Sequence, residues 1–252
     1  MAQLTRDKFL KLVAAGGASF LGLNPLVRAQ DALKGPLVPW ARLKFIGEMG
    51  DDEDWHVHPN GDLNLIDSIR DQTSLNLEKK WNVADIADLN SMVPYPFLFM
   101  HAEIAPVLDN NARQNLREYF MRGGFVFAED CVHGYGHHGQ SNDNDFFFRA
   151  MRDELTALIP GAKFEQIPLD HPLFHCFYRF NKWPHMQGHE WGPWGLTYQG
   201  RLVSLLSPSD LHCGWTYGDS WFGHEQQVKA MQMGTNIYLY AMTQSSGTTQ
   251  PS

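Results

Sequence analysis

The chain has 252 residues, of which 43% are hydrophobic and 19% are charged. These proportions are typical of one compact globular domain, or at most two small ones, and exclude a collagen-like fibre, a coiled coil and a polytopic membrane protein. Twenty basic and 28 acidic side chains give a net charge of -8 at pH 7. Because no run of Lys or Arg interrupts this acidic balance, the composition argues against a nucleic-acid partner.

The first 30 residues have the pattern of an export signal. Arg6, Lys8 and Lys11 form a basic start, residues 12–23 form a short apolar stretch, and residues 27–29 offer a cleavage site. We therefore expect a periplasmic or other extracytoplasmic protein. Anchoring by an uncleaved N-terminal segment stays open as an alternative.

The sequence of the signal leaves two export routes open. Residues 5–11 resemble the twin-arginine signal, but Asp7 stands where the second arginine belongs, so the general secretory route also stays open. Removal of residues 1–30 leaves 16 basic and 27 acidic side chains, a net charge of -11, which repels phosphate backbones and anionic lipid. Cys131, Cys176 and Cys213 are odd in number, which argues against a disulfide framework.

After the signal we expect a linker over residues 31–40, one α/β domain over 41–243 and a disordered tail over 244–252. Apolar runs predict short buried strands, and apolar positions at helical spacing predict helices between them. The expected strands are 43–47, 96–100, 125–128, 164–167 and 202–206, and the expected helices are 62–75, a helix that begins after Asp109 and stops at Gly123-Gly124, 145–158 and 228–242. Periodicity fails over 168–200, for which we expect an irregular segment.

Alternating strands and helices predict an α/β three-layer sandwich with a mostly parallel sheet. The carboxyl ends of parallel strands share one edge, where ligands bind in open sheets. The opposite strand ends carry Arg42, Pro96, Gly124 and Gly200, which offer little for catalysis. At the carboxyl ends we predict ligand-binding roles for Glu48, Asp54, Glu103, Asp170, His171 and His212, with Asp210 and Cys213 in the same positions.

Four motifs in a fixed order carry a family resemblance. They are Tyr95-Pro96-Phe97-Leu98-Phe99-Met100-His101, Asn115-Leu116-Arg117-Glu118-Tyr119, the run from Arg122 to Asp130, and Asp170-His171-Pro172. Together they resemble the exported bacterial "domain of unknown function 4159" family, over roughly residues 40–243. The resemblance implies a flavodoxin-like fold related to class I glutamine amidotransferases. It implies no activity, so function has to be argued from the site.

One candidate site is catalytic and centres on Cys131. This thiol follows a strand, as the amidotransferase nucleophile does, and His133 or His101 could act as its base, with Asp130 beside them. However, a nucleophile elbow requires Gly-x-Cys-x-Gly leading directly into a helix, whereas Asp130-Cys131-Val132-His133-Gly134 leads into a loop. An inert, partly buried cysteine is the competing interpretation.

A second candidate site is a metal centre. His56-Val57-His58 projects two imidazoles to the same side of an extended chain. Together with Asp54, His101 or His133, these side chains could bind a divalent transition metal such as zinc. Solvated loop histidines are the competing interpretation.

Aromatic side chains gather late in the chain, at Trp183, Trp191, Trp194, Trp215, Tyr217 and Trp221. They suit sugar stacking or a protein interface, but they also suit anchoring of an irregular segment to the core.

Taken together, the sequence favours an exported domain that binds a small molecule or carbohydrate without intact amidotransferase machinery. The alternatives are a hydrolase that uses Cys131 with a histidine or a histidine-bound metal, and a structural subunit that binds protein partners in the cell envelope.

Overall fold

The computed structural model describes residues 35, 37–48, 50, 54–131, 145–217 and 219–244. A seven-stranded sheet runs through its centre, with strand order β3-β1-β4-β6-β9-β8-β7. The strands are β1 (Val38–Lys44), β3 (Leu77–Asp85), β4 (Phe97–Ala102), β6 (Phe125–Asp130), β7 (Lys163–Gln166), β8 (Trp194–Tyr198) and β9 (Arg201–Ser207).

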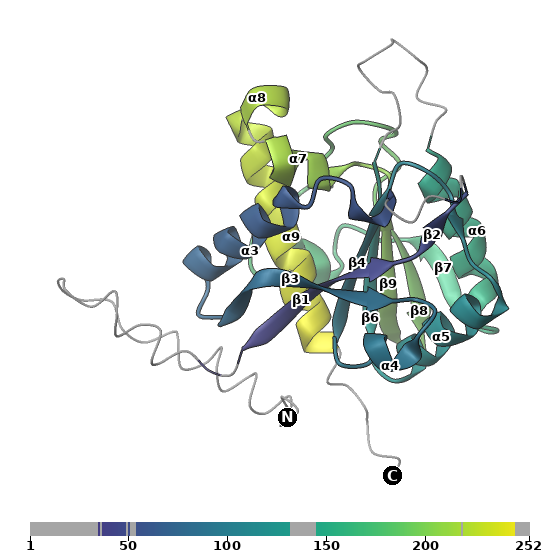
Figure 1. Cartoon of the computed structure of the whole chain (residues 1–252). Helices are drawn as coiled ribbons and strands as arrows, with labels where there is room; N and C mark the ends of the chain where they lie inside the picture. The colour runs from purple at the N-terminus through teal and green to yellow at the C-terminus, as the bar shows by residue number, and fades with distance from the viewer. Residues whose placement is uncertain are drawn as a thin grey trace.

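Helices cover both faces of this sheet (Figure 1). One face carries α3 (Asn60–Gln72), α7 (Leu211–Tyr217) and α9 (His224–Gln244), and the other carries α5 (Asn110–Met121) and α6 (Phe146–Leu158). The remaining short elements are η1 (Asp54–His56), α4 (Leu89–Met92), η2 (Pro172–Phe174), α8 (Asp219–Phe222) and a hairpin of β2 (Ile46–Gly47) with β5 (Pro106–Val107). The predicted α/β three-layer sandwich with a mostly parallel sheet is confirmed.

The five parallel strands define where a ligand site belongs. In chain order they are β1, β3, β4, β6 and β9, so their spatial order is 2-1-3-4-5, the flavodoxin-like order. The order reverses between β1 and β4, which pair only through Arg42 and Phe99. In such sheets ligands bind at this reversal, beyond the carboxyl ends of the strands.

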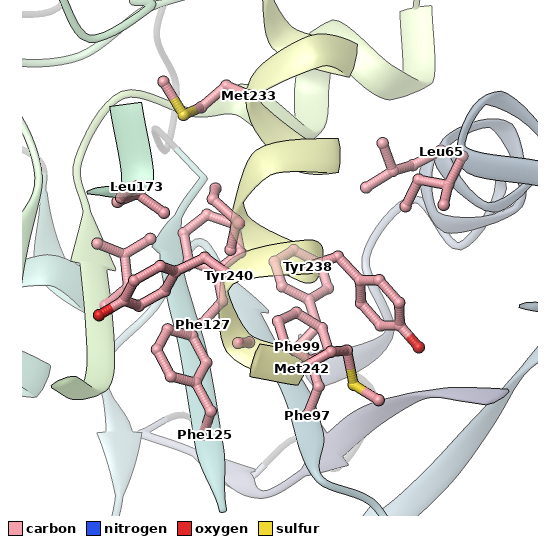
Figure 2. Packing of buried hydrophobic residues seen from close by; sticks show 14 of the residues in the cluster. Leu65, Phe97, Phe99, Phe125, Phe127, Leu173, Met233, Tyr238, Tyr240 and Met242 are labelled. Carbon is pink, nitrogen blue, oxygen red and sulfur yellow. The ribbon is translucent and has the colours of Figure 1, made fainter. Parts of the chain in front are cut away.

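Residue alternation along β4 orients the side chains at that edge. Phe97 and Phe99 pack on the face of α9, where Figure 2 shows them in one cluster with Tyr238 and Met242, whereas Leu98 and Met100 pack on the face of α5 and α6. His101 therefore continues the row of Phe97 and Phe99. Its ring stacks on that of Phe99, with the centroids 5.6 Å apart.

Several predicted elements are confirmed. The apolar runs at 96–100, 125–128 and 202–206 form β4, β6 and β9, and the expected helices form α3, α5, α6 and α9. The side chain of Asp109 caps α5 as expected, because it accepts a hydrogen bond from the backbone N–H of Ala112 at 2.7 Å.

Other elements differ from the prediction. β1 begins at Val38, inside the expected linker, because Pro39 lies near the strand start, where a missing N–H is tolerated. Consequently Arg42 lies in the second half of β1, not at the opposite end of the sheet as expected. The expected strand 43–47 divides between β1 and β2.

Two strands of the central sheet were not predicted. β3 is an edge strand with a mostly polar sequence, which protects the edge from aggregation but hides it from hydropathy. β8 lies inside the segment expected to be irregular. It contains Gly195, where a Cβ would come within 2.4 Å of the Leu202 side chain, so the strand needs a residue that usually indicates a loop.

Some predictions fall outside the described residues: the export signal over 1–30, His133 and the tail beyond Gln244. Among the helices that the structure describes, none is both long enough and apolar enough to cross a membrane.

Candidate functional site

Arg42 and Asp62 form an enclosed ion pair at the point where the strand order reverses. The Arg42 Nε donates to both carboxylate oxygens at 3.0 Å, its Nη2 also pairs with Asp62, and Trp40 donates from its indole at 2.7 Å. Burial opposes ionisation of Asp62, but the Arg42 charge and the hydrogen bonds from His212 and Arg42 outweigh it and hold the pKa of Asp62 well below its usual range. The carboxylate is therefore ionised and neutralised by Arg42.

Arg42 also fixes the chain segment that precedes α3. Its Nη1 donates to the backbone carbonyls of Trp55 at 3.1 Å and Val57 at 2.8 Å. These bonds hold the following residue, His58, at the carboxyl edge of the sheet.

His101 and His212 face one another beside the ion pair, with ring centroids 4.2 Å apart. The His212 Nε2 lies 3.0 Å from Arg42 Nη2 and 3.2 Å from Asp62 Oδ2. Burial and the neighbouring His101 lower the pKa of His212 to about 3, and burial also lowers the pKa of His101. Both imidazoles are therefore neutral near pH 7, the state in which a ring nitrogen can ligate a metal.

His101, Cys131 and Asp210 form a first group of converging ligand atoms. One ligand atom from each lies within 4.8 Å of the other two, and all three side chains are buried. Neither ring nitrogen of His101 has a hydrogen-bond partner in the part of the chain that the structure describes. The His101 Nε2 lies 3.8 Å from Asp210 Oδ1, which is too long for a hydrogen bond.

The backbone and two neighbours hold Asp210 in this group. Asp210 has a φ of 53°, in the left-handed region that non-glycine residues rarely adopt. Gln187 donates to Asp210 Oδ2, and the backbone N–H of Cys213 donates to Oδ1 at 3.3 Å. Burial opposes ionisation, but His101 and the side chains of Gln187 and Cys213 outweigh it and keep the pKa of Asp210 below its usual range.

His58, Glu103 and Cys131 form a second group that shares the same sulfur. Their ligand atoms also lie within 4.8 Å of one another, and His58 and Glu103 are half-buried. The Cys131 thiol lies 3.9 Å from Glu103 Oε1. The Tyr217 hydroxyl lies 3.0 Å from His58 Nδ1, so α7 holds the imidazole in place.

Glu129 and Asp130, at the end of β6, bind the starts of two helices. Glu129 accepts the backbone N–H groups of Leu211 at 2.8 Å and His212 at 2.9 Å at the start of α7. Asp130 points to the other face and accepts the N–H of Phe148 in α6 at 2.5 Å. Burial raises the pKa of both carboxyls well above the usual range. Their contacts make them helix-positioning groups, in contrast to the catalytic role expected for Asp130.

Carboxyl groups outnumber cations in the interior at this edge. Among the described residues, the buried carboxyl groups are Asp62, Glu129, Asp130, Asp145 and Asp210, whereas the buried guanidinium is that of Arg42 alone. Arg42 neutralises only Asp62. Glu129 and Asp130 need no counter-charge, because their raised pKa favours the neutral acid, and Asp145 pairs with His189. The pKa of Asp210 is instead lowered, so its buried carboxylate is an anion that a bound cation would stabilise.

Comparison with known proteins adds a family. The sequence profile of the domain of unknown function DUF4159 matches residues 40–242. The chain belongs to this family. A search of the curated proteins found no match, so the DUF4159 site has to be interpreted from its own geometry.

The structure brings together five of the predicted site residues of this DUF4159 chain. They are His58, His101, Glu103, Cys131 and His212. The carboxyl end of β4 supplies His101, the start of α7 supplies His212, and the segments after β1, β4, β6 and β9 supply the other three and the adjoining Asp210, as expected from the shared edge of parallel strands.

Other predicted site residues lie elsewhere. Glu48 and Asp170 are exposed, and the His56 ring packs against Trp81, 5.5 Å between centroids. The His171 ring packs against Tyr240, which contacts Phe125 at the start of β6. His171 is therefore near the opposite end of the sheet, because the chain after β7 turns back along α9. The side chain of Asp54 and all of His133 lie outside the described residues.

Within the part of the chain that the structure describes, Cys131 does not have the surroundings of an activated nucleophile. Its hydrogen-bond partners among the described residues are Cys213, with the two sulfurs 3.9 Å apart, and Glu103. The contact with Cys213 and burial raise the pKa of the Cys131 thiol well above its usual value.

Most of the late aromatic side chains of the DUF4159 chain belong to the core. Trp183 and Trp215 are buried, and Trp191 and Trp194 pack partly buried against the core. Trp221 differs, because it is 48% exposed and stacks on Tyr217 with ring centroids 3.9 Å apart.

Sequence reasoning missed Arg42, Asp62 and Gln187. The signal for Arg42 was a single charge between buried apolar neighbours in a strand, which indicates an internal ion pair. Asp62 and Gln187 carry no comparable signal, because an acid in the first turn of a helix and an amide in a glycine-rich segment usually face solvent.

Proposed function

We propose that this chain binds a small molecule through a divalent transition-metal ion, with zinc as the best fit, at the carboxyl edge of its sheet. The observation that carries the proposal is the His101 side chain, which is 1% exposed and has no hydrogen-bond partner on either ring nitrogen among the described residues. A buried polar group without a partner costs about 1–3 kcal/mol. A metal ion bound to the ring would remove this cost.

The chemistry of the neighbouring side chains supports zinc. Imidazole, thiolate and carboxylate are all zinc ligands, and a thiolate disfavours calcium and magnesium. Tetrahedral zinc places such ligand atoms roughly 3.3–3.8 Å apart. His101 Nε2 and Asp210 Oδ1 are already 3.8 Å apart, and Cys131 lies within 4.8 Å of both. Small side-chain movements would complete the geometry.

Three protein ligands leave a position for an external molecule. Structural zinc sites have four protein ligands, whereas sites that bind water or substrate have three. The open position is where a small anionic or carbonyl-bearing molecule would bind. The raised pKa of Cys131 argues against thiol chemistry of the amidotransferase kind. A zinc-bound water would make the same site hydrolytic, which is the second candidate function.

Metal analysis and cobalt substitution test the proposal. We expect purified, reduced chain to bind at least one zinc ion, and its cobalt form to show a thiolate-to-cobalt charge-transfer band. His101→Gln and Asp210→Asn should weaken binding by more than about tenfold. His56→Gln is the matched control, because His56 lies outside both ligand groups. Absence of bound metal, or equal loss in the control, would overturn the proposal.

Carbohydrate binding is supported by a separate observation. Trp221 presents an exposed ring beside Tyr217, whose hydroxyl contacts His58 of the site, and tryptophan faces stack on sugar rings. A glycan array read with wild type and Trp221→Ala tests this. Binding of a glycan that the variant loses would support it, and no glycan binding would contradict it.

We also propose that the chain works outside the cytoplasm, where it could join a cell-envelope assembly. The support is the basic start and short apolar stretch within residues 1–30. Expression of the full chain in a bacterial host tests this. Recovery of protein that begins at Gln30 from the periplasm would support export, and an intact chain in the cytoplasm would contradict it.

A further inference from the structure

The two ligand groups at the sheet edge have the same composition and share one sulfur. His101 and Asp210 complete one group with Cys131, and His58 and Glu103 complete the other. Each group therefore adds one imidazole and one carboxylate to the shared sulfur. Resting on the proposed function, we propose that this edge holds two divalent metal ions, zinc by chemistry, bridged by the Cys131 thiolate.

Distances around Cys131 suit a bridging sulfur. Its Sγ lies 3.9 Å from Glu103 Oε1 in the second group and belongs to the first group within 4.8 Å. Zinc–sulfur bonds are about 2.3 Å long, so one sulfur can bind two ions about 3.5–4 Å apart, the separation found in two-metal centres. Such a pair suits a ligand that presents two oxygen atoms, one to each ion.

Neighbouring groups already orient the ligands of both ions. Gln187 and the Cys213 backbone hold Asp210, and the Tyr217 hydroxyl holds His58 at 3.0 Å. Ligands of protein metal sites characteristically have such outer partners.

Backbone conformation also distinguishes His58 and Asp210. Of the described non-glycine residues, only His58, Gln199 and Asp210 have a positive φ, at 48°, 51° and 53°. Gln199 lies in the turn between β8 and β9, which explains its conformation. The other two strained residues are one member of each ligand group, and such strain concentrates at functional sites.

The chemistry of loading balances without any redox step. The S–H bond of Cys131 breaks, its proton goes to solvent, and the sulfur lone pairs form one bond to each ion. No electron is transferred, and both metals stay divalent.

Metal counting with matched variants tests the second ion. We expect about two zinc ions per reduced wild-type chain, and about one in Glu103→Gln and in His58→Gln, whose half-buried side chains tolerate substitution. His56→Gln, as the matched control, should keep two. Cys213→Ser should also keep two, because it excludes a disulfide with Cys131 while leaving both groups intact.

Cobalt paramagnetic resonance gives a second measurement. Two cobalt ions that share a thiolate couple magnetically, so the fully loaded wild type should show a diminished signal. Glu103→Gln should show the full signal of a single ion with its charge-transfer band intact. One ion in wild type, unchanged by Glu103→Gln and His58→Gln, would overturn the pair but leave the proposed function standing. No bound metal at all would overturn both.

Discussion

Arg42 and Asp62 neutralise one another where neither reaches solvent, with exposures of 1% and 0%. Each would be strongly destabilising alone, because a buried charge without its partner keeps its desolvation cost. The pair connects β1 to α3 at the reversal of strand order, and through Trp55 and Val57 it also fixes the segment before His58. The fold and the site therefore depend on the same interaction.

We predict that breaking this pair destabilises the protein strongly. Arg42→Met or Asp62→Asn should each lower the free energy of unfolding by about 3–5 kcal/mol, measured by urea denaturation. The double variant Arg42→Met/Asp62→Asn should lose less than the sum of the two single losses, since it leaves no buried charge unpaired. The exposed pair of Arg113 and Glu154 is the control, and Arg113→Ala should cost less than about 1 kcal/mol. Equal losses from both pairs would contradict the enclosed geometry.

The same pair predicts a pH dependence in acid. Asp62 has a lower pKa in the folded than in the unfolded chain, so its stabilisation is complete above its ordinary pKa of 3.8 and is lost as the pH falls further. The stability difference between wild type and Asp62→Asn should therefore shrink from about pH 5 to about pH 2. The raised pKa of Glu129 changes stability with pH in the opposite direction. Because Glu129 is present in both proteins, its contribution cancels in the stability difference. A constant difference would show that Asp62 is not ionised.

The sequence predicted the central strands because their physical signal is local. β4 and β6 are buried on both faces, and this burial requires unbroken apolar runs. β8 was hidden because its second residue, Gly195, is required by close contact with a neighbouring strand that no local pattern reveals.

The site could be predicted only where a side chain follows a parallel strand. His101 and Cys131 lie at the carboxyl ends of β4 and β6, and the direct parallel pairing of these two strands brings them together. His171 was expected at the same edge but was wrongly placed, because the path of the chain after β7 depends on packing against α9. Asp62 sits on a helix, where a carboxylate ordinarily faces water, so its burial becomes evident only in three dimensions.

Gly61 gives a test of helix propensity against close packing. Alanine in place of glycine usually stabilises a helix by roughly 1 kcal/mol. Here a Cβ would lie 2.5 Å from both His212 Nε2 and Thr216 Oγ1. We therefore expect Gly61→Ala to lower the free energy of unfolding by about 1–3 kcal/mol, the range for overpacked cores.

A control on the same helix separates these effects. Asp67→Ala changes an exposed position of α3 and should shift the free energy of unfolding by no more than about 0.5 kcal/mol. Stabilisation by Gly61→Ala in the same urea experiment would mean that α3 and α7 do not approach as closely as described.

Thiol accessibility separates a buried metal ligand from an exposed nucleophile. Cys176 is exposed, whereas Cys131 and Cys213 are buried. Burial raises the pKa of Cys176 to about 11, and burial raises the pKa of Cys213 to about 12 against the opposing contact with Cys131. Because the thiolate is the reactive form, none of the three should react as fast as a model thiol. Cys176 should nevertheless react first with iodoacetamide at neutral pH.

Peptide mass spectrometry over a time course checks this order. Zinc should slow the labelling of Cys131 further, because a metal-bound thiolate is shielded, and should leave the rate at Cys176 unchanged. Unfolding in urea should make all three cysteines react alike. If Cys131 instead reacts fastest in the folded, metal-free chain, its thiol is activated and accessible, and the hydrolase that uses Cys131 with a histidine becomes the better interpretation of the site.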